Sequence, residues 1–331
     1  MKRISTFLLI VLSALATSVF ADNSLYWPAP PPVAKIQLLE TFASEKDFPK
    51  SPRPWYKNLF NVILGLKQEN RLIGPYGIGG SKDKLYITDP GARTIWLVDA
   101  RRQALEEWVS AYDLPELQQP IDIVVGPDEK VYVSDSSAQK VFVFNPKGKL
   151  ESCFEGFARP TGLAIDRSHN LLFVADTLAH EVRVISLQTG EVVQVIGERG
   201  ADGGTFNFPV HLAFKDGKLY VVDSMNFRVQ VFDRNYALVT QFGQIGDGYG
   251  DFSRPKGISV DSDGNIYVVD GLMDRVQIFN LAGDLLLAFG RTGTNPGEFW
   301  LAADIYIDEA DRIYVADTYN HRVQVFQYLG E

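Results

Sequence analysis

The sequence predicts an all-β fold built from six similar units in series. An aspartate recurs about every 47 residues, always at the end of an apolar run, which indicates a repeated structural unit. Its six copies are Asp89, Asp135, Asp176, Asp223, Asp270 and Asp317. A unit of this size cannot bury its own apolar face, so it must stack on its neighbours.

Each repeat alternates between apolar and polar residues over four short segments, as strands do. The clearest repeat contains the segments 255–260, 265–270, 275–279 and 284–289. The turns between them are rich in glycine, asparagine and aspartate, which supply the positive φ angles of tight hairpins. Six four-stranded antiparallel units in series are what a β-propeller needs. We therefore predict a single six-bladed β-propeller.

The motifs inside the repeats also resemble a known family. The pattern Pro-x-Gly-Ile, then Tyr-Val-x-Asp, then Asn-x-Arg-Val-x-Val-Phe is best kept in residues 207–232, 253–279 and 314–326. With these motifs the chain resembles the NHL-repeat β-propellers over residues 72–331. The resemblance is weakest in the first repeat, and in the third, where Glu181 replaces the basic residue.

The sixth repeat ends without a fourth strand. The segment 38–42 has the pattern of the outer strands 238–242 and 285–289. We expect residues 36–43 to supply the missing strand and close the ring, because closure removes exposed sheet edges. The propeller then occupies residues 36–331.

The first 21 residues have the composition of an export signal. Lys2 and Arg3 precede an apolar stretch, and small residues mark a cleavage site after Ala21. We expect residues 1–21 to be a cleaved signal peptide and the protein to be periplasmic or secreted. The alternative is an uncleaved membrane anchor, although the apolar run is shorter than the ~20 residues of a spanning helix.

Two further segments lie outside the repeats. Residues 22–35 form a proline-rich lead-in of polyproline character. In the insert 45–70, apolar residues between Trp55 and Leu66 fall at helical spacing. We expect one short helix there, before blade one. It could pack across a face of the propeller or face a partner or a membrane.

Composition limits the partners. The chain has 32 Lys and Arg against 41 Asp and Glu, a net charge of −9. Nucleic-acid affinity depends mostly on cations that neutralise phosphates, so we expect no nucleic-acid partner. The acidity, the leader and the single cysteine also conflict with the RNA-binding and ubiquitin-ligase uses of NHL repeats. We expect a monomer that binds a protein or a small molecule and does not require membrane association.

One position of the repeat varies in an ordered way. The second residue after the proline of each inner strand is Gly77, Asp122, Gly162, His211, Gly257 and Asp304. We expect Asp122, His211 and Asp304 to converge on the channel mouth from alternate blades. Two carboxylates and one imidazole could hold a divalent cation in the central channel. They could equally bond backbone amides or water.

The regular residues of the repeat have a structural interpretation. A residue present in every blade serves a need that every blade has, so we expect the recurring aspartates to accept hydrogen bonds from loop amides. Each should also face the basic residue five positions later, which is Arg228, Arg275 or Arg322 in the last three copies.

No complete catalytic constellation appears in the sequence. We therefore interpret the protein as a binding or scaffold propeller whose contact surface is the channel-mouth face. The loops on this face carry the apolar residues Phe227, Met273 and Tyr319, which we expect to be exposed. The alternative is a metal-dependent lactonase- or lyase-like hydrolytic enzyme with its metal at the channel mouth.

Overall fold

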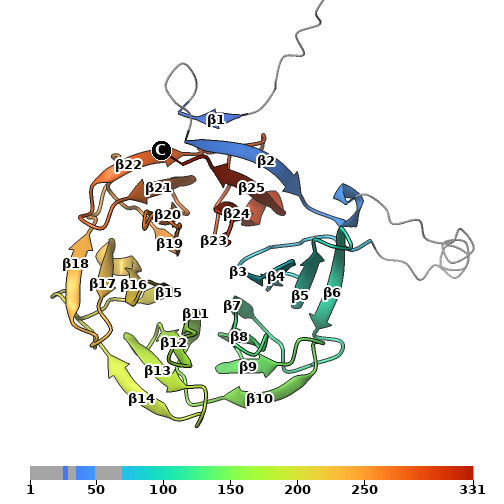
Figure 1. Ribbon diagram of the computed structural model, residues 1–331, viewed down its shortest axis with the longest axis horizontal. Helices are drawn as coiled ribbons and strands as arrows, with labels where there is room; N and C mark the ends of the chain where they lie inside the picture. The colour runs from blue at the N-terminus through green and yellow to red at the C-terminus, as the bar shows by residue number, and fades with distance from the viewer. Residues whose placement is uncertain (1–24, 29–34, 49–68, 331) are drawn as a thin grey trace, which may run out of the picture.

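The computed structural model describes residues 25–28, 35–48 and 69–330. These residues form six antiparallel sheets arranged as blades around a central channel (Figure 1), which confirms the predicted six-bladed propeller. The expected signal peptide, most of the lead-in and the helix expected between Trp55 and Leu66 lie outside the described residues. No helix in the described ranges has the length and apolarity needed to cross a membrane.

Each blade runs from an inner strand at the channel to an outer strand at the rim. Blades one and two contain β3 (Ile78–Ser81), β4 (Lys84–Asp89), β5 (Thr94–Asp99), β6 (Ala104–Ser110), β7 (Pro120–Val125), β8 (Val131–Asp135), β9 (Lys140–Phe144) and β10 (Leu150–Phe154). Blades three and four contain β11 (Pro160–Asp166), β12 (Leu171–Asp176), β13 (Glu181–Ser186), β14 (Val192–Ile196), β15 (Pro209–Lys215), β16 (Lys218–Asp223), β17 (Arg228–Phe232) and β18 (Leu238–Phe242). Blades five and six contain β19 (Pro255–Val260), β20 (Ile266–Asp270), β21 (Arg275–Phe279), β22 (Leu285–Phe289), β23 (Asp304–Ile307), β24 (Arg312–Asp317) and β25 (Arg322–Tyr328). Three short 3-10 helices are η1 (Glu45–Asp47), η2 (Ser224–Asn226) and η3 (Thr318–Asn320).

The strand β2 (Ile36–Phe42) completes blade six, as the sequence predicts. It lies antiparallel to β25, with Ile36 opposite Tyr328 and Phe42 opposite Val323. In Figure 1 the N-terminal β2 lies beside the C-terminal β25, so the two ends of the chain close the ring together.

Part of the lead-in forms a strand instead of a polyproline segment. The strand β1 (Tyr26–Trp27) pairs with the start of β2 as a fifth strand of blade six. The ring of Trp27 packs 5.8 Å from the rings of Phe289 and Phe326, so burial of the indole favours pairing at this point.

The hydrophobic core lies between neighbouring blades. Phe289 of blade five, for example, packs in one cluster with Ile313 and Phe326 of blade six. Each fully buried side chain of this kind contributes about 1.5–3 kcal/mol relative to its exposed state. One blade alone would leave this surface in water, which is why the repeats form a ring.

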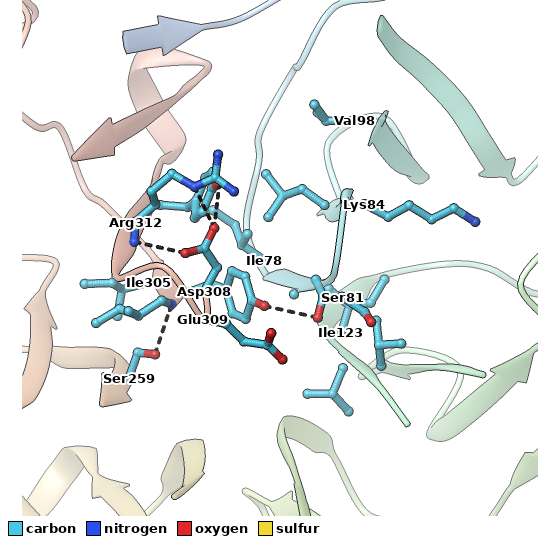
Figure 2. Close-up of a pocket in the computed structure, with 18 of the residues that line it drawn as sticks. Ile78, Ser81, Lys84, Val98, Ile123, Ser259, Ile305, Asp308, Glu309 and Arg312 are labelled. Carbon is cyan, nitrogen blue, oxygen red and sulfur yellow. Dashed lines mark hydrogen bonds and ion pairs between the residues drawn. The ribbon is translucent and has the colours of Figure 1, made fainter. Parts of the chain in front are cut away.

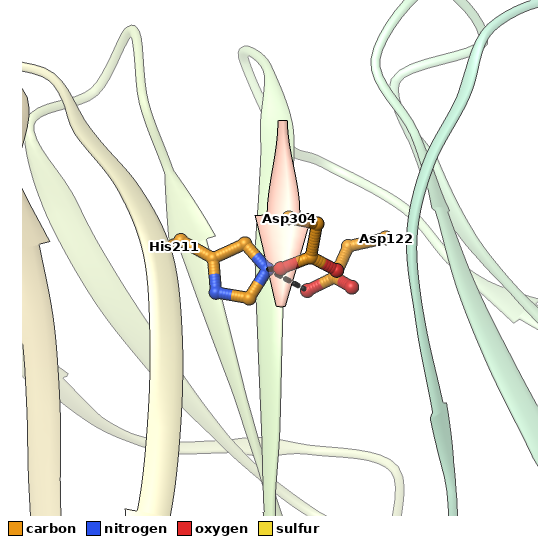
Figure 3. A group of neighbouring side chains, drawn as sticks. All are labelled: Asp122, His211 and Asp304. Atoms are coloured by element: carbon orange, nitrogen blue, oxygen red, sulfur yellow. Dashed lines mark ion pairs between the residues drawn. The ribbon is translucent and has the colours of Figure 1, made fainter. Parts of the chain in front are cut away.

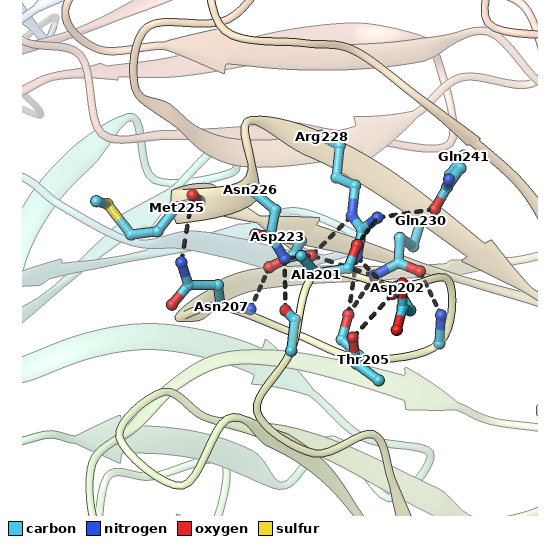
Figure 4. Close-up of polar contacts among 12 residues, drawn as sticks. Ala201, Asp202, Thr205, Asn207, Asp223, Met225, Asn226, Arg228, Gln230 and Gln241 are labelled. Carbon is cyan, nitrogen blue, oxygen red and sulfur yellow. Dashed lines mark hydrogen bonds and ion pairs between the residues drawn. The ribbon is translucent and has the colours of Figure 1, made fainter.

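The recurring aspartates hold the loops of one face, which we call the channel-mouth face. It carries the loops between second and third strands and the connections that enter the inner strands. Asp223 accepts hydrogen bonds from the Asn207 amide at 2.6 Å, from Asn226 Nδ2 at 2.8 Å and from Arg228 Nε at 2.9 Å (Figure 4). Asp317 and Arg322 make the same pair at 2.6 Å. The structural interpretation is confirmed for these residues.

Arg275 departs from the prediction, because it makes no ion pair with Asp270. Four backbone amides donate to the Asp270 carboxylate, those of Ser253, Arg254, Leu272 and Met273. The Nε of Arg275 is buried without a hydrogen-bond partner among the described residues, and its guanidinium lies 5.0 Å from the ring centroid of Tyr249. Blade five has Met273 where blades four and six have an asparagine that donates to the aspartate, so its loop is bonded differently.

Candidate functional site

Asp122, His211 and Asp304 meet on the channel axis (Figure 3). They lie on β7, β15 and β23, the inner strands of blades two, four and six, and we call them the axial trio. Their candidate ligand atoms all lie within 4.8 Å of one another. The Nε2 of His211 is 2.8 Å from an oxygen of Asp304 and 3.5 Å from an oxygen of Asp122. The convergence expected from alternate blades is therefore present.

Each member of the axial trio also contacts the main chain of the next blade. The three backbone amides are Leu163, 2.6 Å from Asp122, Ile78, 2.8 Å from Asp304, and Ile258, 3.4 Å from Nδ1 of His211. Within its own blade, each aspartate accepts from the amide of the following residue. The two aspartates therefore bond blade two to three and six to one. The Nδ1 of His211 lies near the Ile258 amide of blade five, but it can accept that hydrogen bond only in the neutral imidazole.

Glycine alternates with these residues because the neighbouring backbone leaves no room for a side chain. A Cβ atom on Gly162 would lie 2.4 Å from the Cα of His211, and one on Gly257 would lie 2.6 Å from the Cα of Asp304. A Cβ atom on Gly77 would lie 2.8 Å from the Cα of Asp122. Real Cβ contacts are longer than this, so the alternation in the sequence reflects close approach of the blades.

The axial trio is a buried, charged cluster. The aspartates are 2% and 1% exposed, so the trio lies inside the channel, below the mouth. Burial opposes protonation of His211, but the charges of Asp304 and Asp122 outweigh it and hold the imidazole pKa well above its usual range. Burial also raises the pKa of the Asp304 carboxyl, against the charge of His211. Such a cluster can hold a proton or bind a cation.

A cavity of about 900 Å³ reaches the trio from the face opposite the mouth. Asp122 and His211 line it at the axis, and the hairpins between first and second strands line it farther out. The charged residues that line it outside the trio are Glu40, Asp47, Lys82, Asp83, Lys84, Glu129, Arg167, Lys215, Asp308, Glu309 and Arg312. Asp308 accepts from Arg312 at 2.7 Å (Figure 2). The sequence placed the trio at the channel-mouth face, whereas this cavity leads to the hairpin face.

Two of the three residues expected to be exposed on the channel-mouth face are partly buried. Tyr319 is exposed, but Phe227 and Met273 are not. Phe227 ends η2 in the left-handed conformation, with φ of 55°, which turns its ring toward the core between blades four and five. The expectation was therefore correct for Tyr319 and wrong for the other two.

The exposed apolar residues of this face occupy a different loop position. The second residue after the recurring aspartate is Leu178, Met225, Leu272 and Tyr319 in blades three to six. These four side chains are between 50% and 57% exposed, and we call them the apical arc. Trp300 extends the arc, since its ring lies 5.8 Å from that of Tyr319. Reading one fixed position through all repeats would have identified the arc.

Comparisons with protein families agree with the fold. A family model described as a 6-bladed beta-propeller matches residues 206–286, and the NHL repeat model matches residues 299–326. Among curated proteins, NHL repeat-containing protein 2 of Gallus gallus is 32% identical over 133 residues, which is 32% of this chain. The match covers 18% of that protein's length.

Several solved structures share the architecture at low sequence identity. A streptogramin B lyase has a TM-score of 0.57 at 14% identity, with 78% of this chain and 85% of the lyase covered. An auxiliary nutrient binding protein from Bacteroides thetaiotaomicron has a TM-score of 0.63 at 14% identity, covering 78% and 70% of the two chains. One from Bacteroides ovatus has a TM-score of 0.62 at 13% identity, covering 77% and 69%. At these identities the likeness shows the fold alone.

Proposed function

We propose that this chain, a six-bladed β-propeller of the NHL-repeat type, is a binding module whose contact surface is the channel-mouth face. One observation carries the proposal: a single loop position exposes an apolar side chain in four neighbouring blades. Apolar side chains gathered on one face are typical of interaction sites. A rigid ring that displays variable loops suits recognition. Two similar structures are named as auxiliary nutrient binding proteins, which agrees with a binding role.

The proposal is tested by site-specific photo-crosslinking in the native cellular compartment. A photoreactive amino acid at Leu272 should form adducts with the ligand or partner. The same amino acid at Val239 is the matched control, because Val239 is 48% exposed on the outer strand β18, away from the mouth. Adducts specific to position 272 support the proposed surface. Equal adducts at both positions, or none at 272, would contradict it.

We also propose that the module works outside the cytoplasm. The basic start, the apolar stretch and the small residues before Asp22 support export. The exported protein should have the mass of a chain that begins at Asp22. Recovery of the full-length chain from the cytoplasmic fraction alone would contradict this localisation.

A second candidate function is metal-dependent hydrolysis or elimination at the axial trio. It is favoured by the cavity that reaches Asp122 and His211 and by ligand atoms within 4.8 Å of one another. Carboxylate oxygens suit Ca²⁺ and Mn²⁺, and the imidazole admits Zn²⁺. A metal here would activate water or polarise a substrate oxygen. The Nε2 proton that faces the carboxylates would have to leave first.

Metal analysis separates this candidate from a purely structural trio. Protein purified without added metal or chelator should contain about one equivalent of a divalent cation if the candidate is correct. The double variant Asp122→Asn/Asp304→Asn keeps similar side-chain volumes and should contain none. Equal metal content in the two proteins would exclude a metal site at the trio.

A further inference from the structure

Three cationic residues stand where the chain enters the inner strands of blades three and five, on the channel-mouth face. Arg159 and Arg254 precede the proline of the inner strand in blades three and five, and Lys256 follows that proline in blade five. The carbonyl of Arg159 accepts from the Thr177 amide at 3.0 Å, and that of Arg254 from the Gly271 amide at 3.1 Å. Each arginine therefore adjoins the loop that carries Leu178 or Leu272. We call Arg159, Arg254 and Lys256 the mouth cations.

The mouth cations have no anionic partner among the described residues. The guanidinium groups of Arg159 and Arg254 are exposed and make no ion pair or hydrogen bond there. Other arginines near this face are engaged, as Arg228 is with Asp223 and Arg322 with Asp317. Cations without an anionic partner on one face of a chain of net charge −9 attract an anionic ligand.

Lys256 crosses the mouth toward blade one. Its Nζ lies 5.2 Å from the centroid of the Tyr76 ring, over blade six, where the equivalent position is the small residue Ala303. Its stem packs on Gly271, where a Cβ would lie 3.1 Å from the lysine Cδ. The hydroxyl of Tyr76 has no hydrogen-bond partner among the described residues. The ammonium group therefore lies over the ring of a tyrosine whose hydroxyl can still donate a hydrogen bond.

The charges of the buried trio and of the two arginines act on Tyr76. Burial raises the pKa of the Tyr76 phenol, and so does the charge of Asp304. The charges of Arg254 and Arg159 lower this pKa by a smaller amount. The phenol therefore keeps its proton at neutral pH and can donate it in a hydrogen bond. Donation to an anion would add to the attraction of the mouth cations.

We propose that the mouth cations bind the anionic group of a small amphiphilic ligand whose apolar body lies on the apical arc. The inference rests on the proposed function and names the chemistry of the ligand. Charged groups in front of an apolar surface select a molecule with one anionic end and one apolar end. The anion forms ion pairs with Arg159, Arg254 and Lys256, and the Tyr76 hydroxyl donates a hydrogen bond to it.

Two fluorescent probes with the same aromatic body test the inference. Anilinonaphthalene sulfonate is anionic, and its parent phenylnaphthylamine is uncharged. Wild type should bind the sulfonate at least about tenfold more tightly, a difference of roughly 1.4 kcal/mol. The triple variant Arg159→Gln/Arg254→Gln/Lys256→Gln should lose this preference and bind the uncharged probe as wild type does. The double variant Arg159→Gln/Arg254→Gln changes only exposed residues and should lose part of the preference.

The controls separate this inference from the binding function on which it rests. Lys147→Gln removes an exposed cation from an outer hairpin and should leave both affinities unchanged. A variant in which the apical arc is replaced, with Leu178→Ser, Met225→Ser, Leu272→Ser and Tyr319→Ser together, should bind both probes more weakly. If the cation variants retain the preference, the inference is overturned and the binding surface stands. If the arc variant binds both probes like wild type, the proposed contact surface fails instead.

Discussion

At the scale of single residues, the channel depends on a strict division between glycine and polar side chains. Glycines 77, 162 and 257 allow the backbones of two blades to approach, and Asp122 and Asp304 bond the main chain of the blade that follows. A hydrogen bond to a charged group contributes about 1.5–3 kcal/mol when its geometry is good. These aspartate hydrogen bonds therefore stabilise the ring whether or not the trio binds a ligand.

Gly162→Ala should destabilise the propeller, since the new methyl group would lie 2.4 Å from the Cα of His211. Overpacking of this kind costs about 1–3 kcal/mol. Gly74→Ala is the matched control, because the nearest atom to its Cβ is 3.7 Å away and an alanine fits. Thermal unfolding should show a clear loss for the first variant and little change for the second. Equal melting temperatures would contradict the packing explanation.

The imidazole of His211 should make stability fall as the pH rises above neutral. Although burial opposes it, the charges of Asp304 and Asp122 hold the folded-state pKa well above 6.5. A pKa raised by folding contributes stability that is complete below the unfolded pKa and is lost as the pH rises through the folded pKa. Melting temperatures of wild type should fall from about pH 6 to pH 8, whereas those of His211→Gln should change less. Parallel profiles would exclude His211 as the source.

Lys256 should make anion binding depend on pH. Burial, together with the charge of Arg254, lowers the pKa of the ammonium group to about 8. The unliganded mouth therefore loses one positive charge as the pH rises through this value, and affinity for the sulfonate probe should fall roughly three- to tenfold between about pH 7 and 9. Lys256→Arg keeps its charge throughout and should bind the probe equally at both ends of the range. A wild-type affinity independent of pH would contradict this role.

The sequence identified the axial trio but not the mouth cations, for a physical reason. The members of the trio occupy the same position of the repeat, because the same position of every inner strand faces the channel axis. Aligning the repeats therefore reveals them together. Arg159, Arg254 and Lys256 occupy two different positions of the repeat, and only the side-chain path of Lys256 over Ala303 brings it to Tyr76. A long side chain can reach in several directions, and the repeat pattern does not specify which.

At the scale of elements, the strands follow the repeat closely and the loops follow it less. The strands β19 to β22 lie within one residue of the predicted segments, because alternation and turn residues are local signals. The loop of blade five differs from those of blades four and six through one substitution, Met273 in place of an asparagine. Loop bonding depends on such individual donors, so Arg275 could not be assigned from the repeat alone.

Removal of β2 should strongly destabilise the protein. The strand contributes the buried residues Ile36 and Phe42 and covers the edge of β25. A chain without residues 22–44 should melt at least about 10 °C lower and aggregate through the exposed edge. A chain without residues 22–24 retains β1 and β2 and is the control. An unchanged melting temperature in the longer deletion would refute the role of β2 in closure.

At the scale of the whole molecule, the number of blades and the closure of the ring follow from the repeat, but the position of the described cavity does not. The described cavity leads to the hairpin face, while the apolar and cationic groups gather on the channel-mouth face. The place of a cavity along a channel depends on side chains from all blades at once. A sequence pattern read blade by blade does not contain this information.

The alternation at the axis also sets the symmetry that any bound molecule meets. Three interfaces between blades are tight backbone contacts at glycine, and at each of the other three a member of the axial trio lies against the main chain of the following blade. At the axis the six interfaces are thus of two kinds that alternate around the ring, which gives the centre a local threefold arrangement. A group on the axis is surrounded by three polar side chains instead of six. Duplication of a two-blade unit would produce this arrangement directly, whereas duplication of a single blade would place the same residue at all six positions.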